Sequence, residues 1–149
     1  NAAMIGLGLA LAQPKRRVLV ITGDGEMLMG MGSLATIGVQ KPRNLSVVVI
    51  DNERYGETGM QATHTAAGVD LAKVAQGCGF KVARRIGSAM QLAALRAALH
   101  RSSGPLFAQV KVVAEKIPLV LPPRDGGLLK ARFRRALLGE AGRPHLRAG

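Results

Sequence analysis

Two short polar segments of this chain each follow a hydrophobic run, and their residue types could bind a metal ion and a phosphate. Gly23, Asp24 and Gly25 follow residues 17–22 (RVLVIT), and Asp51 and Asn52 follow residues 45–50 (LSVVVI). Carboxylate and carboxamide oxygens are hard donors that suit Mg²⁺ or Ca²⁺. A helix that begins at Gly25 would add N–H groups and a dipole that favour a phosphate.

Each segment alone has a plainer interpretation, because Asp is common in turns and caps and Gly supplies positive φ angles. The segments follow consecutive strands joined by one helix, and ligands of parallel sheets bind where the carboxyl ends of the strands meet. Together they favour a site for Mg²⁺ and a diphosphate. Other phosphate loops fit less well: the chain has no Gly-Lys-Ser/Thr, and Gly6-Leu7-Gly8 precedes a strand instead of following one.

Strands and helices alternate along the chain and would place both segments at such an edge. Helical spacing and capping residues predict helices at 1–13, where Gly6 and Gly8 allow close backbone contact, at 27–39, after Asp70, after Ser88 and at 128–138. Apolar runs predict strands at 17–22, 45–50, 80–86 and 105–113. This order predicts an α/β fold with a doubly wound, mostly parallel sheet and helices on both faces. We expect one domain over residues 1–149, with 114–149 as a C-terminal extension that carries a basic helix.

Composition limits the class of protein. The single cysteine, Cys78, excludes an internal disulfide and a Cys-based zinc cluster, so we expect a reducing, cytoplasmic setting. Cys78 falls on the apolar face of the helix after Asp70, which indicates a core residue rather than a nucleophile. The apolar stretch 2–12 is too short to span a bilayer and lacks the basic segment of a signal peptide. Because the chain starts at Asn1 without a Met, we expect that its true N-terminus is missing.

The net charge of +12 has two interpretations. Basic residues gather toward the end, where seven Lys and Arg from Arg124 onward face only Asp125 and Glu140. A basic nucleic-acid-binding module would use such charge to displace counterions from phosphates. Aromatic residues make up only 3% of the chain, however, and no nucleic-acid-binding motif is present. We therefore expect no nucleic acid and no membrane as partner, and favour a solvated surface or a face for an acidic partner subunit.

The strings GDGEMLMGMGSLATIG and DNERYGETGMQATHT resemble thiamine diphosphate-dependent enzymes, over about residues 1–113. The resemblance is to their diphosphate-binding, C-terminal domain, and most of all to the small 2-oxoacid decarboxylases that act on phosphonopyruvate and sulfopyruvate. It implies thiamine diphosphate and Mg²⁺ as cofactors. The ligands of Mg²⁺ would be the Asp24 and Asn52 side chains and the backbone carbonyl of Arg54. The implied cofactor-binding residues are Gly23, Asp24, Gly25, Glu26, Met27, Asn52, Tyr55, Gly56, Glu57 and Thr58.

Two positions depart from the pattern of the resembled family. That family usually has two Asn residues where this chain has Asp51 and Asn52, and often a Gly where Arg54 stands. The loop 55–65 is polar and contains glycine, so we expect a lid over the cofactor. His64 within it is a candidate proton donor or contact for an anionic substrate, and a solvated loop residue is its plainer interpretation.

The resemblance also implies parts that this chain lacks. In the resembled family a glutamate on a partner domain activates the aminopyrimidine of the cofactor, and Glu53 and Glu57 are poor candidates for it because they flank the metal loop. We therefore expect a pyrimidine-binding domain or alpha subunit as partner, a homo- or hetero-oligomer, and a 2-oxoacid substrate. An acetolactate-synthase-like carboligase shares the cofactor motif and stays open as an alternative, as does the nucleic-acid-binding module.

Overall fold

The computed structural model describes residues 1–101, 103–115, 118 and 120–139. The chain forms two compact units, Asn1–Lys116 and Ile117–Gly149, and each is described by itself. The first unit contains the sheet and both of the polar segments that could bind a ligand. The second unit contains the basic helix.

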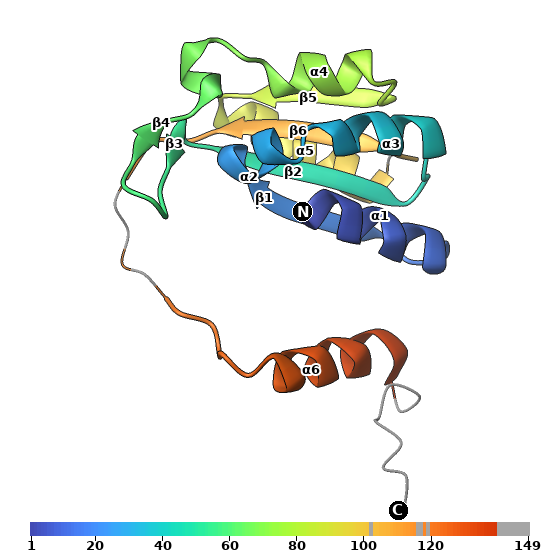
Figure 1. Ribbon diagram of the computed structural model, residues 1–149. Helices are drawn as coiled ribbons and strands as arrows, with labels where there is room; N and C mark the ends of the chain where they lie inside the picture. The colour runs from blue at the N-terminus through green and yellow to red at the C-terminus, as the bar shows by residue number, and fades with distance from the viewer. Residues whose placement is uncertain (102, 116–117, 119, 140–149) are drawn as a thin grey trace, which may run out of the picture. The chain divides into compact units, whose positions relative to one another are not determined.

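A parallel sheet of four strands forms the centre of the first unit. The strands are β1 (Val18–Gly23), β2 (Leu45–Asp51), β6 (Leu106–Lys111) and β5 (Val82–Ile86), in that spatial order. Gly23 pairs with Ile50, and Ile50 pairs with Val110. Because all of these pairs are parallel, the carboxyl ends of β1, β2 and β6 lie at one edge of the sheet (Figure 1).

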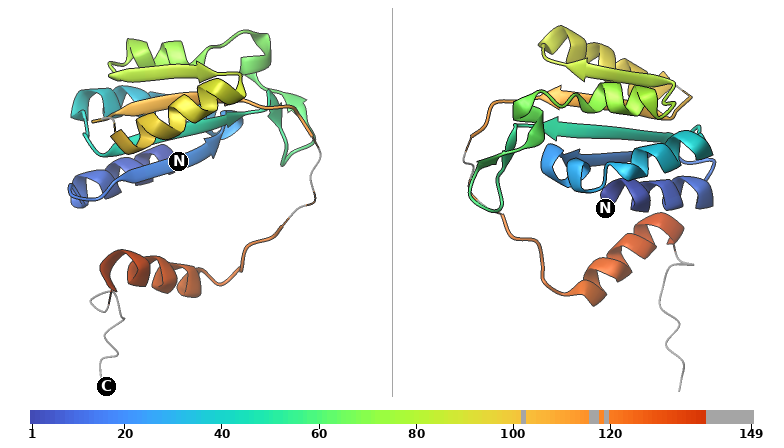
Figure 2. Two further views of the ribbon diagram at one scale, coloured as in Figure 1. Left: turned by 180° about the vertical axis from the view of Figure 1, so that it is seen from behind. Right: turned by 45° about the horizontal axis from the view of Figure 1, so that its top comes forward.

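Helices cover both faces of the sheet, which confirms the doubly wound fold. One face packs against α1 (Ala2–Ala12), α2 (Asp24–Met29), α3 (Gly32–Gln40) and α4 (Leu71–Gly77). The other face packs against α5 (Ala89–Arg101), as the view from behind shows (Figure 2). Parallel sheets take this form because their strands are apolar on both sides and both sides must be buried.

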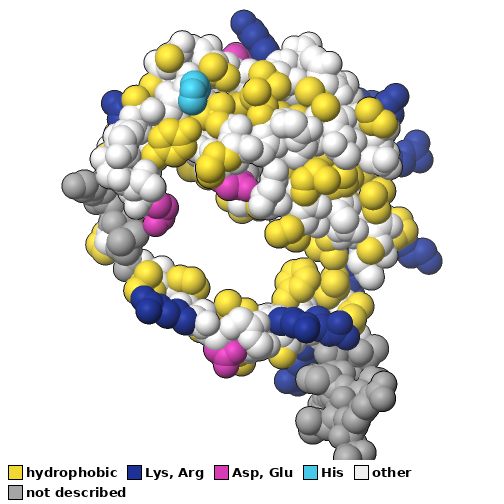
Figure 3. Space-filling model, viewed as in Figure 1, with side chains coloured by type: hydrophobic (Ala, Val, Ile, Leu, Met, Phe, Trp, Pro, Cys, Tyr) yellow, Lys and Arg dark blue, Asp and Glu magenta, His cyan; other side chains and the backbone are white. Residues whose placement is uncertain are grey.

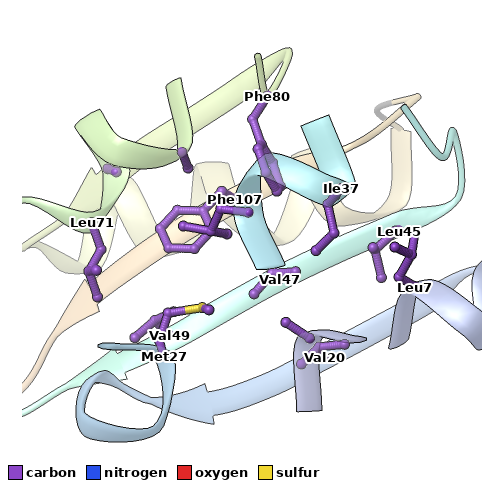
Figure 4. Packing of buried hydrophobic residues seen from close by; sticks show 14 of the residues in the cluster. Leu7, Val20, Met27, Ile37, Leu45, Val47, Val49, Leu71, Phe80 and Phe107 are labelled. Atoms are coloured by element: carbon purple, nitrogen blue, oxygen red, sulfur yellow. The ribbon is translucent and has the colours of Figure 1, made fainter. Parts of the chain in front are cut away.

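The larger core lies between the sheet and α1–α4 (Figure 4). Met27 of α2 and Ile37 of α3 are fully buried there with Val47 and Val49 of β2. Phe80 and Phe107 pack edge to face, with ring centroids 5.9 Å apart and an angle of 80° between the ring planes. Burial of each large apolar side chain contributes about 1.5–3 kcal/mol, so this core fixes the helices that carry the polar edge.

Two sequence predictions about the helices were wrong in detail. The helix predicted at 27–39 is two helices, α2 and α3, separated at Gly30 and Met31. Gly30 and Gly32 have low helix propensity, and α2 ends with Gly30 as its C-cap. The second wrong prediction is close contact at Gly8, where an added Cβ would meet nothing within 4 Å. Gly6 does allow close contact as expected, since an added Cβ there would lie 2.2 Å from Val20 Cγ2.

The predicted caps of α4 and α5 are confirmed. The Asp70 side chain accepts a hydrogen bond from Lys73 N at 3.0 Å, which caps the start of α4. Gln91 N donates to Ser88 Oγ at 3.3 Å, and Gln91 Oε1 accepts from Gly87 N at 2.8 Å. Cys78 is partly buried against the larger core, in agreement with a structural role.

At the amino ends of the strands, the Asn44 side chain, just before β2, binds the connection between α1 and β1. Asn44 Nδ2 donates to the carbonyl oxygens of Ala10, Gln13 and Arg16 at 2.8–3.0 Å. The Asn44 carbonyl accepts from Val18 N, the first residue of β1, at 2.8 Å. A surface hollow of about 300 Å³ at this end is lined by Pro14, Lys15, Arg16, Arg17, Arg43, Asn44, Arg101 and Ser103. This end of the sheet is therefore basic and is held by bonds to the backbone.

The second unit contains α6 (Gly126–Leu138), whose first turn is capped by the Asp125 side chain accepting from Leu128 N at 2.9 Å. Its Lys130, Arg132, Arg134 and Arg135 are exposed, and so is Phe133. The space-filling view shows basic side chains along this unit, and others at the rim of the first unit, whose visible face is mostly apolar or uncharged (Figure 3). Arg143 and Arg147 of the predicted basic tail lie outside the described residues. Within the described ranges no helix combines the length and the apolar character that crossing a membrane requires.

Candidate cofactor and metal site

The two polar segments meet at the carboxyl edge of the sheet. Because Gly23 pairs with Ile50, Asp24 and Asp51 follow at neighbouring strand ends. Asp24 is 2% exposed and Asp51 is fully buried. The expectation that both segments lie at one edge is confirmed, and both acids are more deeply buried than turn residues on a surface would be.

Asp24 is held through one of its two carboxylate oxygens. Its Oδ2 accepts from Thr63 Oγ1 at 2.6 Å and lies 3.2 Å from Thr65 Oγ1. Among the described residues no donor bonds to Asp24 Oδ1. The carboxylate is thus fixed in one orientation and keeps one oxygen available as a ligand for a cation.

Sequence reasoning missed the two threonines that hold Asp24. Thr63 caps the short 3₁₀ helix η1 (His64–Ala67), and Thr63 and Thr65 are both buried although the residues around them are exposed. A signal was present in the sequence, because two β-branched hydroxyl residues separated by one residue can place both hydroxyls on the same side of an extended segment. Their partner Asp24 is about 40 positions away, and the sequence alone does not name it.

The start of α2 supplies free backbone donors. Gly23 is the N-cap of α2 and makes no side-chain cap bond, so the N–H groups of the first turn have no capping acceptor. Gly25 lies against the Tyr55 ring, where an added Cβ would be 2.6 Å from Tyr55 Cδ1. A side chain at position 25 would therefore displace Tyr55.

The side chains of Glu26 and Met27 have structural partners. Glu26 accepts from Ala2 N at 2.9 Å and from the Thr22 hydroxyl, so it caps the start of α1. Met27 is fully buried in the core. Of the predicted cofactor-binding set, these two residues can therefore offer only their backbone groups.

The turn after β2 bends tightly around Asn52. Asp51 Oδ1 accepts from Glu53 N and Asn52 Oδ1 accepts from Arg54 N, both at 3.0 Å. Glu53 has a φ of 61°, a left-handed conformation that residues other than glycine seldom adopt. An amide oxygen has two lone pairs, so Asn52 Oδ1 can bind a cation while it accepts from Arg54 N.

The segment predicted to be a lid is a small hairpin that is anchored at one end. β3 (Arg54–Tyr55) pairs antiparallel with β4 (Gln61–Ala62), and Gly56, Glu57 and Thr58 at its tip are exposed. Thr63 N bonds to Glu53 O at 3.0 Å, and buried Thr65 ends the segment. The hairpin tip and β4 are thus exposed, and the segment is held at its Thr63–Thr65 end. His64 is also exposed and makes no hydrogen bond to Asp24 among the described residues.

A buried polar network connects the turn to β6. Asp51 Oδ2 accepts from Gln109 Nε2 at 2.5 Å and lies 3.0 Å from Lys111 Nζ, and Lys111 also pairs with Glu53. Gln109 Oε1 accepts from Ala72 N of α4 at 3.1 Å. The network therefore joins α4, β6 and the turn around Asn52.

Charges in this network stabilise each other. Burial raises the pKa of Asp51, but hydrogen bonds from Gln109, Lys111, Thr65 and the Glu53 backbone outweigh it and hold that pKa below 3.8. Burial lowers the pKa of Lys111, but its bonds to Glu53 and Asp51 outweigh it and hold that pKa above 10.5. Both groups are therefore charged at neutral pH.

The donors at this edge fit a hard divalent cation. They comprise one carboxylate oxygen of Asp24, the amide oxygen of Asn52 and backbone carbonyls of the turn, and all of them are oxygens. In the part of the chain that the structure describes, no three His, Cys, Asp or Glu side chains gather as a metal cluster. Mg²⁺ typically binds one or two carboxylates and completes its shell with phosphate oxygens or water, and this donor set suits it.

Comparison with known proteins identifies the family. Residues 1–110 match the family described as thiamine pyrophosphate enzyme, C-terminal TPP binding domain. The chain belongs to this family. The cofactor class that the GDG and DN segments implied is thereby confirmed, while the individual site residues stay predictions.

Curated relatives agree with the resemblance in the sequence. The chain is 53% identical over 78 residues to a protein named sulfopyruvate decarboxylase subunit beta from Methanocaldococcus jannaschii, covering 52% of this chain and 41% of that protein. It is 40% identical over 112 residues to a phosphonopyruvate decarboxylase from Streptomyces viridochromogenes, covering 75% of this chain and 28% of that protein. The chain thus spans less than half the length of these two relatives.

The fold is also found in a solved structure. The benzoylformate decarboxylase of Polynucleobacter necessarius superposes with a TM-score of 0.61 over 79% of this chain and 24% of that chain, at 22% identity. At this level of identity the match establishes the fold alone. It confirms the α/β architecture that the alternation of strands and helices predicts.

Proposed function

We propose that this chain is the diphosphate- and Mg²⁺-binding part of a thiamine diphosphate-dependent 2-oxoacid decarboxylase. Its substrate would be an anionic three-carbon 2-oxoacid such as sulfopyruvate or phosphonopyruvate. The observation that carries the proposal is Asp24, a buried carboxylate at the carboxyl edge of the sheet, with one oxygen held by threonine and the other available, in a chain that matches the thiamine pyrophosphate-binding family. The names of the similar proteins support the choice of substrate class.

Each part of the edge has a role in this proposal. Asp24, Asn52 and the Arg54 carbonyl hold Mg²⁺, and the N–H groups of the first turn of α2 hold the diphosphate. Tyr55 lies against Gly25 in that turn, and the exposed hairpin tip, Gly56 to Thr58, would cover the diphosphate. When bound, thiamine diphosphate would supply the electron sink for the loss of CO₂ from the substrate.

The proposed enzyme needs a second part. Glu26 and Glu53 have partners in this chain, and Glu57 is at the exposed hairpin tip, so none of them is free in the site to activate an aminopyrimidine. One relative is named a subunit beta, which supports a partner that supplies the missing groups. We propose a pyrimidine-binding domain or alpha subunit as this partner, in an oligomer. The single cysteine supports a reducing, cytoplasmic location.

An assay of the assembled protein tests the proposed activity. CO₂ release is measured with saturating Mg²⁺ and thiamine diphosphate, using sulfopyruvate, phosphonopyruvate and pyruvate side by side. We expect a higher kcat/KM for sulfopyruvate and phosphonopyruvate, which carry an additional anionic group, because a basic protein focuses positive potential into a cleft. A preference for pyruvate would contradict the substrate class, and acetolactate as the main product would favour the carboligase.

The chain assayed without its partner provides a second test. Loss of acid–base assistance to the cofactor removes about 10²–10⁴-fold of the rate, so we expect the chain alone to bind cofactor and turn over far more slowly than the assembly. Equal turnover per site would contradict the need for a partner. A salt-dependent shift of duplex DNA without any binding of thiamine diphosphate would instead favour a nucleic-acid-binding module.

The donor set also predicts which metals support cofactor binding. Because the proposed ligands are all oxygens, we expect Mg²⁺, Mn²⁺ and Ca²⁺ to support binding of thiamine diphosphate. The measurement is calorimetric titration of the cofactor into metal-free protein after addition of each metal. Binding that required Zn²⁺ and ignored the other three would contradict an all-oxygen site.

A further inference from the structure

Lys111 is bonded to both neighbours of Asn52. Its ammonium group lies 3.0 Å from Asp51 Oδ2 and pairs with Glu53 Oε1. Lys111 ends β6, and its side chain is 19% exposed. As a cation it cannot bind a metal ion, so its relation to the site is through the two acids that flank Asn52.

The backbone conformation of Glu53 explains how its pair with Lys111 affects the turn around Asn52. Glu53 is left-handed, which residues with a Cβ disfavour, and two bonds oppose its relaxation. One is the pair with Lys111, and the other is the bond from Glu53 N to Asp51 Oδ1 at 3.0 Å. The turn they hold sets where the Asn52 side chain and the Arg54 carbonyl point, so Lys111 controls the geometry of two of the proposed metal ligands.

A second group, the Thr65 hydroxyl, holds the Asp51 carboxylate at the side that faces Asp24. Thr65 Oγ1 lies 2.8 Å from Asp51 Oδ1, 3.2 Å from Asp24 Oδ2 and 2.9 Å from Thr63 Oγ1. A hydroxyl has a single proton to donate, and the shortest of these contacts assigns it to charged Asp51. The Thr63 proton is then the one that holds Asp24 Oδ2, at 2.6 Å, so the two threonine oxygens, 2.9 Å apart, share no proton, and the Thr65 hydroxyl holds Asp51 alone.

From these contacts we propose that Lys111 is a positioning residue for the metal site. Through Asp51 and Glu53 it presets the turn of Asn52 before a cation arrives, and the Thr65 hydroxyl holds the same Asp51 carboxylate in place. The proposal rests on the proposed function, because it takes Asp24 and Asn52 as ligands. Partners that orient metal ligands by hydrogen bonds typically change metal affinity about 10–100-fold when they are removed.

The test measures metal affinity without catalysis. Mn²⁺ is titrated into the assembled protein with saturating thiamine diphosphate, and the free ion is counted by its electron paramagnetic resonance signal. The variants are Lys111→Met, which keeps the length of the side chain without its charge, and Thr65→Val, which keeps its shape without the hydroxyl. Lys81→Met is the matched control, because Lys81 is exposed and makes no ion pair among the described residues.

We expect Lys111→Met and Thr65→Val each to weaken Mn²⁺ binding by about 10–100-fold, at a temperature where circular dichroism shows every variant folded. Thr65→Ser restores the hydroxyl and with it the wild-type affinity, and Lys81→Met leaves the affinity unchanged. If Lys111→Met does not fold, Thr65→Val and its rescue by Thr65→Ser decide whether the bonds that hold Asp51 position the metal ligands.

The outcomes separate this inference from the proposed function. Wild-type affinity in folded Lys111→Met or in Thr65→Val would overturn the positioning role and leave the proposed function standing. A loss in Thr65→Val that Thr65→Ser did not restore would also overturn it, because the hydroxyl would not be the group that matters. Absence of Mn²⁺ binding by the wild-type protein with thiamine diphosphate would overturn both.

Discussion

The two ends of the parallel sheet are held by different kinds of hydrogen bond. At the carboxyl ends, Asp24, Asp51 and Thr65 bond to other side chains and are buried. At the amino ends, the Asn44 side chain bonds to three backbone carbonyl oxygens, and the cations around it are exposed. Bonds to the backbone fix the course of loops, whereas bonds among charged side chains fix a charge distribution. The amino end therefore maintains the fold, and the carboxyl end prepares a site.

The largest expected effect is a loss of cofactor affinity when Asp24, at the carboxyl end of the sheet, is replaced. Asp24→Ala removes the only charged ligand proposed for Mg²⁺, and loss of one member of a buried charge pair costs about 2–5 kcal/mol, or ~30-fold and more in affinity. Calorimetry on the assembled protein measures binding of thiamine diphosphate in the presence of Mg²⁺. Asn52→Ala should weaken binding less, because it removes a neutral oxygen. Asp125→Ala, at the cap of α6 in the second unit, is the control, and unchanged binding by Asp24→Ala would refute the assignment.

The second prediction is that a substitution at the amino end of the sheet lowers stability and leaves metal affinity unchanged. Asn44→Ala leaves backbone carbonyls of the α1–β1 connection without a donor, and we expect the free energy of unfolding to fall by about 1–3 kcal/mol. Urea unfolding measures this change. Mn²⁺ affinity of the folded variant should equal that of the wild type. A weakened metal site in Asn44→Ala would mean that the two ends are coupled, and the division of roles would be wrong.

The third prediction concerns pH and the carboxyl end. The pKa of Asp51 is lowered, so its stabilising contribution is present above 3.8 and is lost as the pH falls through its lower value in the fold. The pKa of Lys111 is raised, so its contribution is present below 10.5 and is lost as the pH rises through its higher value in the fold. We expect the free energy of unfolding, measured by urea without cofactor and plotted against pH, to be constant in the middle of this range and to fall at its acid and alkaline ends. Lys111→Met should flatten the alkaline fall, and an unchanged fall would contradict the role of that pair.

The smallest effect is expected at His64. This residue lies between the two buried threonines but is itself exposed. His64→Gln should change the free energy of unfolding by less than about 0.5 kcal/mol and leave Mn²⁺ affinity unaltered. A large loss of kcat/KM without loss of metal affinity would instead assign His64 a role with the substrate, which the sequence left open.

What the sequence could predict here depended on distance along the chain. The meeting of Asp24 with Asp51 followed from two strand patterns and the rule for parallel strands, and the caps at Asp70 and Ser88 followed from local motifs. The break between α2 and α3 was missed because the apolar spacing continues across Gly30. Local patterns carry information about periodicity and caps, and these are short-range properties.

The network behind the site was out of reach for the same reason. Gln109 and Lys111 meet Asp51 and Glu53 across 58 positions, and nothing near Asp51 in the sequence names them. One signal was present: Gln109 is a polar residue within the apolar strand pattern, and buried polar groups need partners. Such a signal says that a partner exists, while the identity of that partner comes only from the fold.

The contact between Tyr55 and Gly25 has a practical consequence for spectroscopy. The chain contains one tyrosine and no tryptophan, so its intrinsic fluorescence comes from a single residue. That residue is packed on the first turn of α2, where an added Cβ at Gly25 would lie 2.6 Å from its ring. A ligand that binds at this turn changes the surroundings of the only fluorophore in the chain. The purified chain therefore carries an optical probe at its own candidate site, and cofactor binding can be followed without any label.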